Sequence, residues 1–133
     1  MVKDVKIGTY HRPWNAYNDL KELPAGIPKA KFWAYYSGGI DQIGCIFTAQ
    51  GFEFDYTGVI FGRDIKYNPV TNEWEGFSDF SYDHQVSGEY FLRLIKNTYR
   101  VLMGRGMKAC YVYFMDKDTE LYFKNRIKQF NGT

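Results

Sequence analysis

Arg105 is the residue whose surroundings point most directly to chemistry. It stands between Gly104 and Gly106, just after an amphipathic segment. A guanidinium presents a planar fork of donors that binds a phosphate through two hydrogen bonds. The two glycines leave room for that fork to extend towards a ligand. The alternative interpretation is an ordinary cation near the carboxyl end of a helix, where it interacts favourably with the helix dipole.

A second candidate segment is Thr48–Asp55, with the sequence TAQGFEFD, which connects two apolar runs. The run before it, Ile43–Thr48, is predicted to be a buried strand, and open parallel sheets bind ligands beyond the carboxyl ends of their strands. Gly51 lets backbone N–H groups approach a ligand, and Glu53 is able to accept hydrogen bonds from hydroxyl groups. A plain strand connection with capping carboxylates explains the same composition.

Other catalytic patterns are missing from the sequence. It contains no GxxxxGK[ST] phosphate-binding loop, no HExxH and no GxSxG. The two histidines, His11 and His84, lie far apart in loop-like surroundings. The two cysteines, Cys45 and Cys110, lie inside apolar runs and lack the spacing of zinc ligands. We therefore expect no metal site, and a small hydrolase or nuclease ranks last among the function classes.

The elements that would position Arg105 and the Thr48–Asp55 segment alternate between strands and helices. Strands are predicted at Phe32–Tyr36, Ile43–Thr48, Tyr56–Phe61 and Ala109–Met115, with a β-hairpin at Ile65–Glu75. Helical spacing of apolar residues predicts a helix over Ser87–Met103, with Ser87 as its N-cap and Gly104 or Gly106 as its end.

The two ends of the chain carry further signals. Val5 and Ile7 indicate an extended start, and Asn15 is a candidate cap for a short helix through Leu20. Near the other end, Asp116 is a candidate cap for a last helix. Its acidic residues come early and its basic residues late, which suits the helix dipole.

Buried strands that alternate with helices predict an α/β fold with a largely parallel sheet flanked by helices and a β-hairpin insertion. The three strands Ile43–Thr48, Tyr56–Phe61 and Ala109–Met115 are expected to share this sheet. Gln50–Glu53 and Arg105 are then expected to meet at its carboxyl-terminal edge.

Composition narrows the function only a little. The chain has 133 residues, of which 45% are apolar and 24% charged, as expected of one globular domain rather than a disordered segment. A net charge of +2 argues neither for nor against nucleic acid, and 20% aromatic residues suit cores, interfaces and base stacking alike. No signal peptide or span of about 20 apolar residues is recognisable, so we expect a cytoplasmic protein that does not enter a membrane.

Two segments in order resemble motifs of superfamily 1 helicases of the UvrD/Rep type. Thr48–Ile60 looks like motif V, with a threonine-bearing strand end, a turn ending in Gly, an apolar residue, Glu and the next strand. Tyr99–Gly106 looks like motif VI, a Tyr and a short apolar stretch before Thr-Arg-(Ala/Gly) at a helix end. With the hairpin segment Asp64–Trp74, residues 30–125 also resemble the C-terminal part of bacterial P-loop ATP-binding proteins related to the helicase half of Schlafen proteins.

This resemblance implies a role for each matching residue. Gly51 would lie beside the nucleotide phosphates, with Gln50 at the position of the usual motif V lysine, whose charge it lacks. Glu53 would bind the ribose hydroxyls, and Thr48 would contact nucleic acid. Arg105 would be the arginine finger that stabilises charge on the transferring phosphoryl group.

For the whole chain, the resemblance implies a second RecA-like domain, the C-terminal half of a helicase-like ATPase. ATP with Mg²⁺ would be bound in the full-length protein by a missing N-terminal P-loop domain, in the same or a partner chain, and DNA or RNA would be the substrate. Gly104 departs from the family, because a Thr is usual there. The alternative is a non-enzymatic module whose exposed aromatic residues bind single-stranded nucleic acid or a protein.

Overall fold

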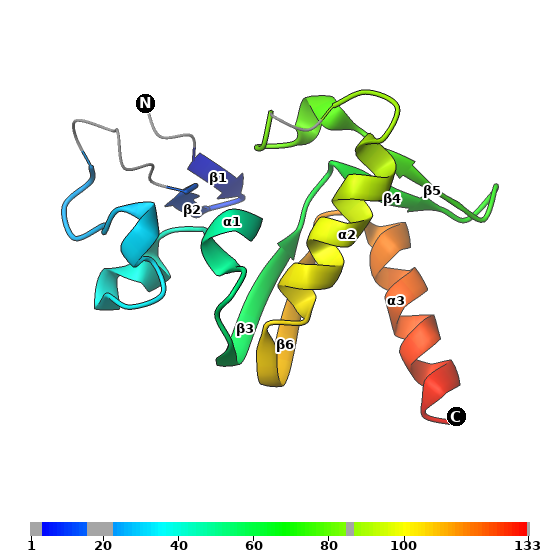
Figure 1. Cartoon of the computed structure of the whole chain (residues 1–133). Coiled ribbons are helices and arrows are strands. Elements are labelled where there is room, and N and C mark those ends of the chain that lie inside the picture. Colours follow the sequence, from blue (N-terminus) through cyan, green and yellow to red (C-terminus); the bar gives the residue numbers. More distant parts are fainter. Residues whose placement is uncertain (1–3, 16–22, 85–86, 133) are drawn as a thin grey trace. The chain divides into compact units, whose positions relative to one another are not determined.

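The computed structural model, drawn in Figure 1, describes residues 4–15, 23–84 and 87–132. The chain divides into two compact units, Met1–Glu53 and Phe54–Thr133, and each is described by itself. The described residues combine helices with parallel and antiparallel strand pairs, which confirms a mixed α/β structure. That residues 1–133 form one helicase-type domain stays a prediction.

The first unit consists of short elements. They are the strands β1 (Asp4–Ile7) and β2 (Tyr10–Pro13), the 3₁₀ helices η1 (Ala30–Phe32) and η2 (Ser37–Asp41), and the one-turn helix α1 (Ile46–Ala49). The two strands pair antiparallel, which confirms the extended start. Asn15 is buried with a φ of 46°, and its N–H donates to the Ile43 carbonyl at 2.7 Å. The helix expected from Asn15 through Leu20 falls largely on residues 16–22, outside the described residues.

Two strand predictions in this unit are wrong. Phe32–Tyr36 forms the end of η1 and a turn, in which the N–H groups of Tyr35 and Tyr36 both donate to the Phe32 carbonyl. In Ile43–Thr48, only Ile43 makes a strand-like bridge, and α1 begins at Ile46. The N–H groups of Thr48 and Ala49 donate to the Cys45 carbonyl. A short apolar run is compatible with a buried helix as well as a strand, and here the local hydrogen bonds decide.

The second unit contains the parallel pair that the sequence predicts. Strands β3 (Phe54–Phe61) and β6 (Gly106–Phe114) are parallel, with Phe61 opposite Phe114 and a register shift near Tyr56. Among the described residues this sheet has two strands, so the prediction of a third strand at 43–48 in the same sheet is wrong. The rest of the unit is the hairpin β4 (Ile65–Asn68) and β5 (Glu73–Gly76), the 3₁₀ helix η3 (Ser78–Phe80) and the helices α2 (Phe91–Met103) and α3 (Lys117–Phe130).

The predicted helix before β6 is present but starts later than expected. Its N-cap is Tyr90, and Gly88 has a φ of 81°, so Ser87 lies outside the helix. The N–H of Phe91 donates to the Gly88 carbonyl and closes a turn ahead of α2. Gly104 is the C-cap, as predicted. No described helix is long and apolar enough to cross a membrane.

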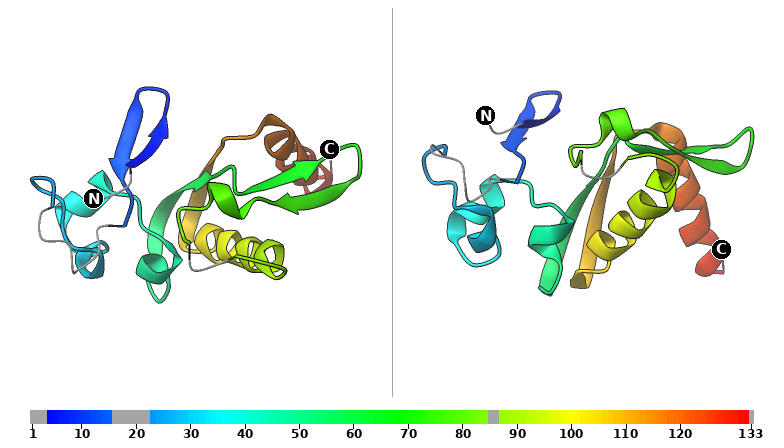
Figure 2. Two further views of the ribbon diagram at one scale, coloured as in Figure 1. Left: turned by 90° about the horizontal axis from the view of Figure 1, so that it is seen from above. Right: turned by 45° about the horizontal axis from the view of Figure 1, so that its top comes forward.

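The core of the second unit lies where α2 packs on β3, and Figure 2 shows this helix alongside the β3–β6 pair. Phe91, Ile95 and Tyr99 are buried at a spacing of four residues, so they form one face of α2. The ring of Tyr99 stacks on Phe61 with centroids 4.1 Å apart. The other core members are Val59 and Ile65, with Trp74, Phe114 and Phe123 packed against the cluster.

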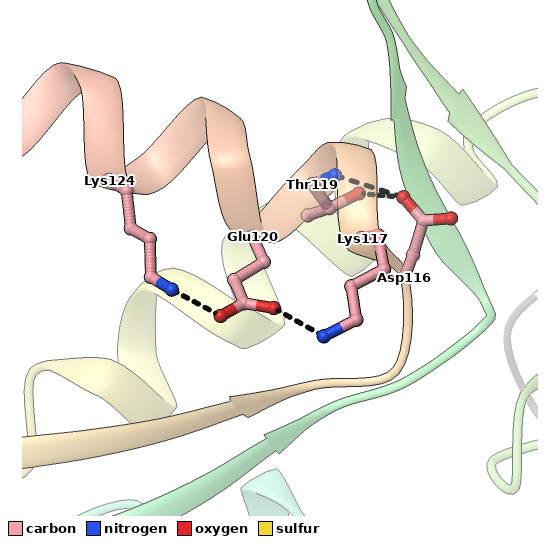
Figure 3. A network of polar contacts seen from close by, with 5 residues as sticks. All are labelled: Asp116, Lys117, Thr119, Glu120 and Lys124. Carbon is pink, nitrogen blue, oxygen red and sulfur yellow. Dashed lines mark hydrogen bonds and ion pairs between the residues drawn. The ribbon is translucent and has the colours of Figure 1, made fainter.

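The start of α3 is fixed by the predicted cap, which Figure 3 shows in close-up. The Asp116 carboxylate accepts from the N–H of Thr119 at 2.9 Å and from its hydroxyl at 2.7 Å. Thr119 is fully buried, and its hydroxyl oxygen accepts from the N–H of Tyr67 in β4 at 3.0 Å. The cap therefore also connects α3 to the hairpin.

We predict that Asp116→Ala lowers the free energy of unfolding by about 1–2 kcal/mol, because it leaves the Thr119 N–H and hydroxyl without their acceptor. Urea denaturation followed by circular dichroism measures the loss. Asp118→Ala is the matched control, since Asp118 is exposed in the first turn without capping it. An equal loss in both variants would show that first-turn charge, not the cap, stabilises α3.

Candidate functional site

Arg105 occupies a tight junction between α2 and β6. The helix ends at Met103, and the N–H of Gly104 points back to the carbonyls of Arg100 and Val101, at 3.2 Å and 3.1 Å. The N–H of Arg105 donates to the Leu102 carbonyl at 3.3 Å. These bonds hold the backbone on the amino side of the Arg105 Cα atom. On the other side the Arg105 carbonyl accepts from the N–H of Phe54, and β6 begins with the next residue.

The side chain of Arg105 is half-buried and oriented by one hydrogen bond. Its Nε donates to the carbonyl of Val101, one turn back in α2, at 3.3 Å. Among the described residues, no hydrogen bond or ion pair involves the two terminal nitrogens of this guanidinium. The donor fork is therefore held at its base while its two outer N–H₂ groups remain available to an oxyanion.

Gly106 is required by packing rather than by a ligand. A Cβ atom at this position would clash with the Ala109 carbonyl oxygen and lie 2.8 Å from the Thr57 hydroxyl oxygen. That hydroxyl is buried and has no hydrogen-bond partner among the described residues. Gly104 has a φ of −84°, an ordinary value for any residue. The flanking glycines thus allow a compact helix-to-strand junction, and the freedom expected from the sequence is not what they provide.

The junction lies at the amino ends of the parallel strands. The N–H of Phe54, the first residue of β3, donates to the Arg105 carbonyl at 2.9 Å, just before β6 begins. Glu53 precedes β3 in the chain as Arg105 precedes β6. The expectation that Gln50–Glu53 and Arg105 lie at the carboxyl-terminal edge of the sheet is therefore wrong. For Gln50–Glu53 it depended on a strand at 43–48, which the structure replaces with α1.

The other candidate residues belong to the first unit. Thr48 lies in α1, and its hydroxyl donates to the Cys45 carbonyl at 2.9 Å. Gln50 ends α1 and is exposed, as are Gly51 and Glu53. Gly51 has a φ of 84°, and an added Cβ would meet nothing within 4 Å. Glycine is thus favoured at 51 by backbone conformation, and the space above it is open.

The sequence analysis did not identify the buried pair of Tyr99, in α2, and Asp64. The Tyr99 hydroxyl donates to the Asp64 carboxylate at 2.7 Å and accepts from the N–H of Gly62 at 2.9 Å. Asp64 and Tyr99 are only 8% and 7% exposed. Burial raises the pKa of the Asp64 carboxyl, and burial with the nearby Asp64 charge raises the pKa of Tyr99 well above its usual value. The signal in the sequence was Tyr99 itself, because a tyrosine on the apolar face of a helix needs a buried hydrogen-bond partner for its hydroxyl.

Within the described ranges, no group of three or more His, Cys, Asp or Glu residues is placed to hold a metal ion. What the second unit does present is a hydrogen-bonded helix-to-strand junction with one half-buried arginine, whose terminal nitrogens have no partner among the described residues. This arrangement suits binding of an anionic group from another part of a protein or from a ligand.

The chain belongs to the family of the Schlafen group 3 DNA/RNA helicase domain, whose family model matches residues 1–116. The resemblance to the helicase half of Schlafen proteins is thereby confirmed. The protein is helicase-like in origin.

One curated relative is the uncharacterized protein YPL245W of Saccharomyces cerevisiae, which is 28% identical over 115 residues. The alignment covers 79% of this chain but only 23% of the yeast protein. The chain thus spans about a quarter of the length of this relative. No solved structure matches the chain.

The buried carboxyl makes stability depend on pH. The pKa of Asp64 in the folded protein is raised above its ordinary value of 3.8, so between these two values the folded state binds more protons than the unfolded state. The free energy of unfolding should therefore fall as pH rises from about 4 to the raised pKa, and should then level off.

We predict that Asp64→Asn removes this decrease, because the amide does not titrate. Chemical denaturation of both proteins at pH values from 4 to 7 measures it. The parent should lose stability relative to Asp64→Asn across the interval. The exposed Asp79→Asn is the control and should follow the parent. A parent that gains stability over Asp64→Asn in this interval would contradict the direction of the pKa shift.

Proposed function

We propose that the chain is the second RecA-like, C-terminal half of a helicase-like ATPase, and that Arg105 is its arginine finger. The observation that carries the proposal is the Arg105 fork. Its Nε is held by the Val101 carbonyl, and its terminal nitrogens are available at a junction fixed by hydrogen bonds on both sides. A donor positioned before the reaction stabilises developing charge without a further cost of reorganisation.

The chemistry supplied by Arg105 would be electrostatic. As a phosphoryl group is transferred, negative charge spreads over its oxygens, and a guanidinium binds two of them at once. Half-burial of the side chain lowers the local dielectric and strengthens this contact relative to a fully solvated arginine. Lysine would not reproduce it, because an ammonium is a point charge without the planar fork.

The exposed segment after α1 would also take part in nucleotide binding. Gly51 has open space around its backbone, so its N–H could approach a phosphate, and the Gln50 side chain would add an uncharged donor. The exposed Glu53 carboxylate would accept hydrogen bonds from the ribose hydroxyls. Thr48 would contact nucleic acid through its remaining lone pairs, because its proton is used by the Cys45 carbonyl.

The remaining parts of the site would come from elsewhere. The sequence lacks the lysine and amide-rich loop of a P-loop, which hold most of the triphosphate charge with Mg²⁺. ATP and Mg²⁺ would therefore be bound chiefly by an N-terminal P-loop domain, in the same chain or a partner. Nucleic acid, DNA or RNA, would be the substrate of the assembled protein.

A second candidate function is a non-enzymatic binding module. It is favoured by the exposed tyrosines of β3 and β6, Tyr56, Tyr111 and Tyr113, whose side chains are able to stack on bases or pack on a protein. This function has no use for an oriented arginine fork at a helix end. Substitution of Arg105 therefore separates the two functions.

We expect the isolated chain to hydrolyse no ATP above background and to bind ATP only weakly, since most of the triphosphate charge would stay uncompensated. A coupled phosphate-release assay and fluorescence titration with a labelled ATP analogue measure the two quantities. Turnover that persists through a second purification and disappears in Arg105→Ala would show that the chain needs no P-loop domain, and would overturn this part of the proposal.

In a protein that contains this chain and its P-loop domain, Arg105→Ala should lower kcat for ATP hydrolysis roughly 10²-fold or more. The KM for ATP should change much less, because the contact strengthens as charge develops in the transition state. Arg105→Lys should restore little activity.

The matched control for this substitution is Arg126→Ala. Arg126 is an exposed arginine in α3, so its removal changes the net charge equally and should alter kcat less than about twofold. A normal kcat in Arg105→Ala would remove the finger assignment. An equal loss in both variants would show that the effect is one of net charge or folding.

A further inference from the structure

The solvent side of α2 carries a row of cations along its length. Arg93, Lys96, Asn97 and Arg100 are exposed at spacings of three and four residues, so they lie on one face of the helix, here called the α2 cationic face. With Leu92 and Glu89 they line an open hollow of about 430 Å³. The opposite side of α2 is the core-facing row of Phe91, Ile95 and Tyr99.

The cations of this face, Arg93, Lys96 and Arg100, form no ion pair with a carboxylate of the described residues. Lys96 has one further contact, with its Nζ 5.8 Å from the centre of the Trp74 ring, which leaves its charge uncancelled. Within α2 itself there is no acidic residue.

The other long helix of the unit differs in this respect. In α3, Lys117 and Lys124 both bind the Glu120 carboxylate, at 3.3 Å and 2.6 Å, and these contacts lower the pKa of Glu120 (Figure 3). A helix that needs charge only for solubility gains from such compensation. A row of exposed cations that form no ion pair among the described residues, as on α2, suits an anionic partner.

We propose that the α2 cationic face binds the phosphate backbone of a single nucleic-acid strand. The choice of this partner rests on the proposed function. The face has two guanidiniums for bidentate phosphate binding, one ammonium and one amide, the side-chain types that contact phosphates. Arg93 and Arg100 are separated by seven residues of helix at ~1.5 Å each, about 10 Å along the helix axis. At ~3.4 Å per phosphate in a stacked strand, this length covers roughly three phosphates.

Glu89 makes the two ends of the α2 cationic face different for an anionic ligand. It lines the hollow ahead of the first turn of α2 and is exposed, so its charge opposes an anionic ligand at that end only. The backbone would therefore follow the helix from Arg93 towards Arg100 and pass clear of Glu89. Glu89→Gln should strengthen binding roughly twofold to fivefold, since one exposed repulsion is removed.

The experiment measures binding of fluorescent dT20 and of the matching rU20 to the 133-residue chain, without nucleotide, from 50 to 300 mM salt. The variant Arg93→Gln/Lys96→Gln/Arg100→Gln should bind about 10-fold or more weakly at 100 mM salt. The slope of log K against log salt should become smaller by about 2, at ~0.7 for each of three lost phosphate contacts. Glutamine keeps the helix propensity, and circular dichroism checks that the variant is folded.

The matched control is Lys117→Gln/Lys124→Gln/Arg126→Gln, which removes three cations from α3 in the same unit. It should change the affinity less than threefold and leave the slope nearly unchanged. Equal losses in the two triple variants would reduce the effect to net charge and overturn the proposal, as would an unchanged affinity in the α2 variant.

An acidic protein surface is the other partner that the charge admits. Polyglutamate of matched charge is therefore added as a competitor, and it should displace dT20 far less effectively than unlabelled dT20 does. Equal displacement would assign the face to an acidic protein instead. Because no ATP is present, these outcomes do not depend on Arg105, and a failed arginine finger would leave them unchanged.

Discussion

Parallel pairing of β3 with β6 is the constraint on which the second unit depends. Parallel strands cannot be joined by a tight turn, so the chain must return to the starting edge through a long crossover. Here the last part of that crossover is α2, which packs Phe91, Ile95 and Tyr99 against β3. The end of α2 consequently lies at the amino edge of the pair, where Phe54 binds the Arg105 carbonyl.

The same return path explains why one helix has two distinct surfaces. Its buried side is held by the Phe61–Tyr99 stack and by the hydrogen bonds of the Tyr99 hydroxyl to Asp64 and Gly62. These contacts limit rotation of α2, which keeps the cations at 93, 96 and 100 outward. Core packing thus determines which side chains of α2 meet solvent, and it also fixes the direction from which Arg105 leaves the helix.

Membership of a Schlafen helicase family gives this geometry a functional setting. A chain that covers about a quarter of a relative's length carries only part of that protein's surface. The terminal nitrogens of Arg105 and the exposed cations of α2 are two features of the second unit that, in our proposals, bind other molecules. One would receive a nucleotide held by another domain, and the other would receive a nucleic-acid strand.

Elements with local signals can be predicted from the amino-acid sequence. The hairpin, the Asp116 cap, the end of α2 at Gly104 and the parallel apolar strands all follow from turn residues, side-chain caps and continuous apolar runs. The segment at 43–48 is ambiguous in the sequence, because an apolar run of that length suits a strand or a helix. In the structure, local hydrogen bonds to the Cys45 carbonyl form the helix. Tertiary structure alone paired Tyr99 with Asp64 and set the Arg105 carbonyl against the N–H of Phe54, since residues so far apart in the chain meet only when α2 and β6 pack on β3.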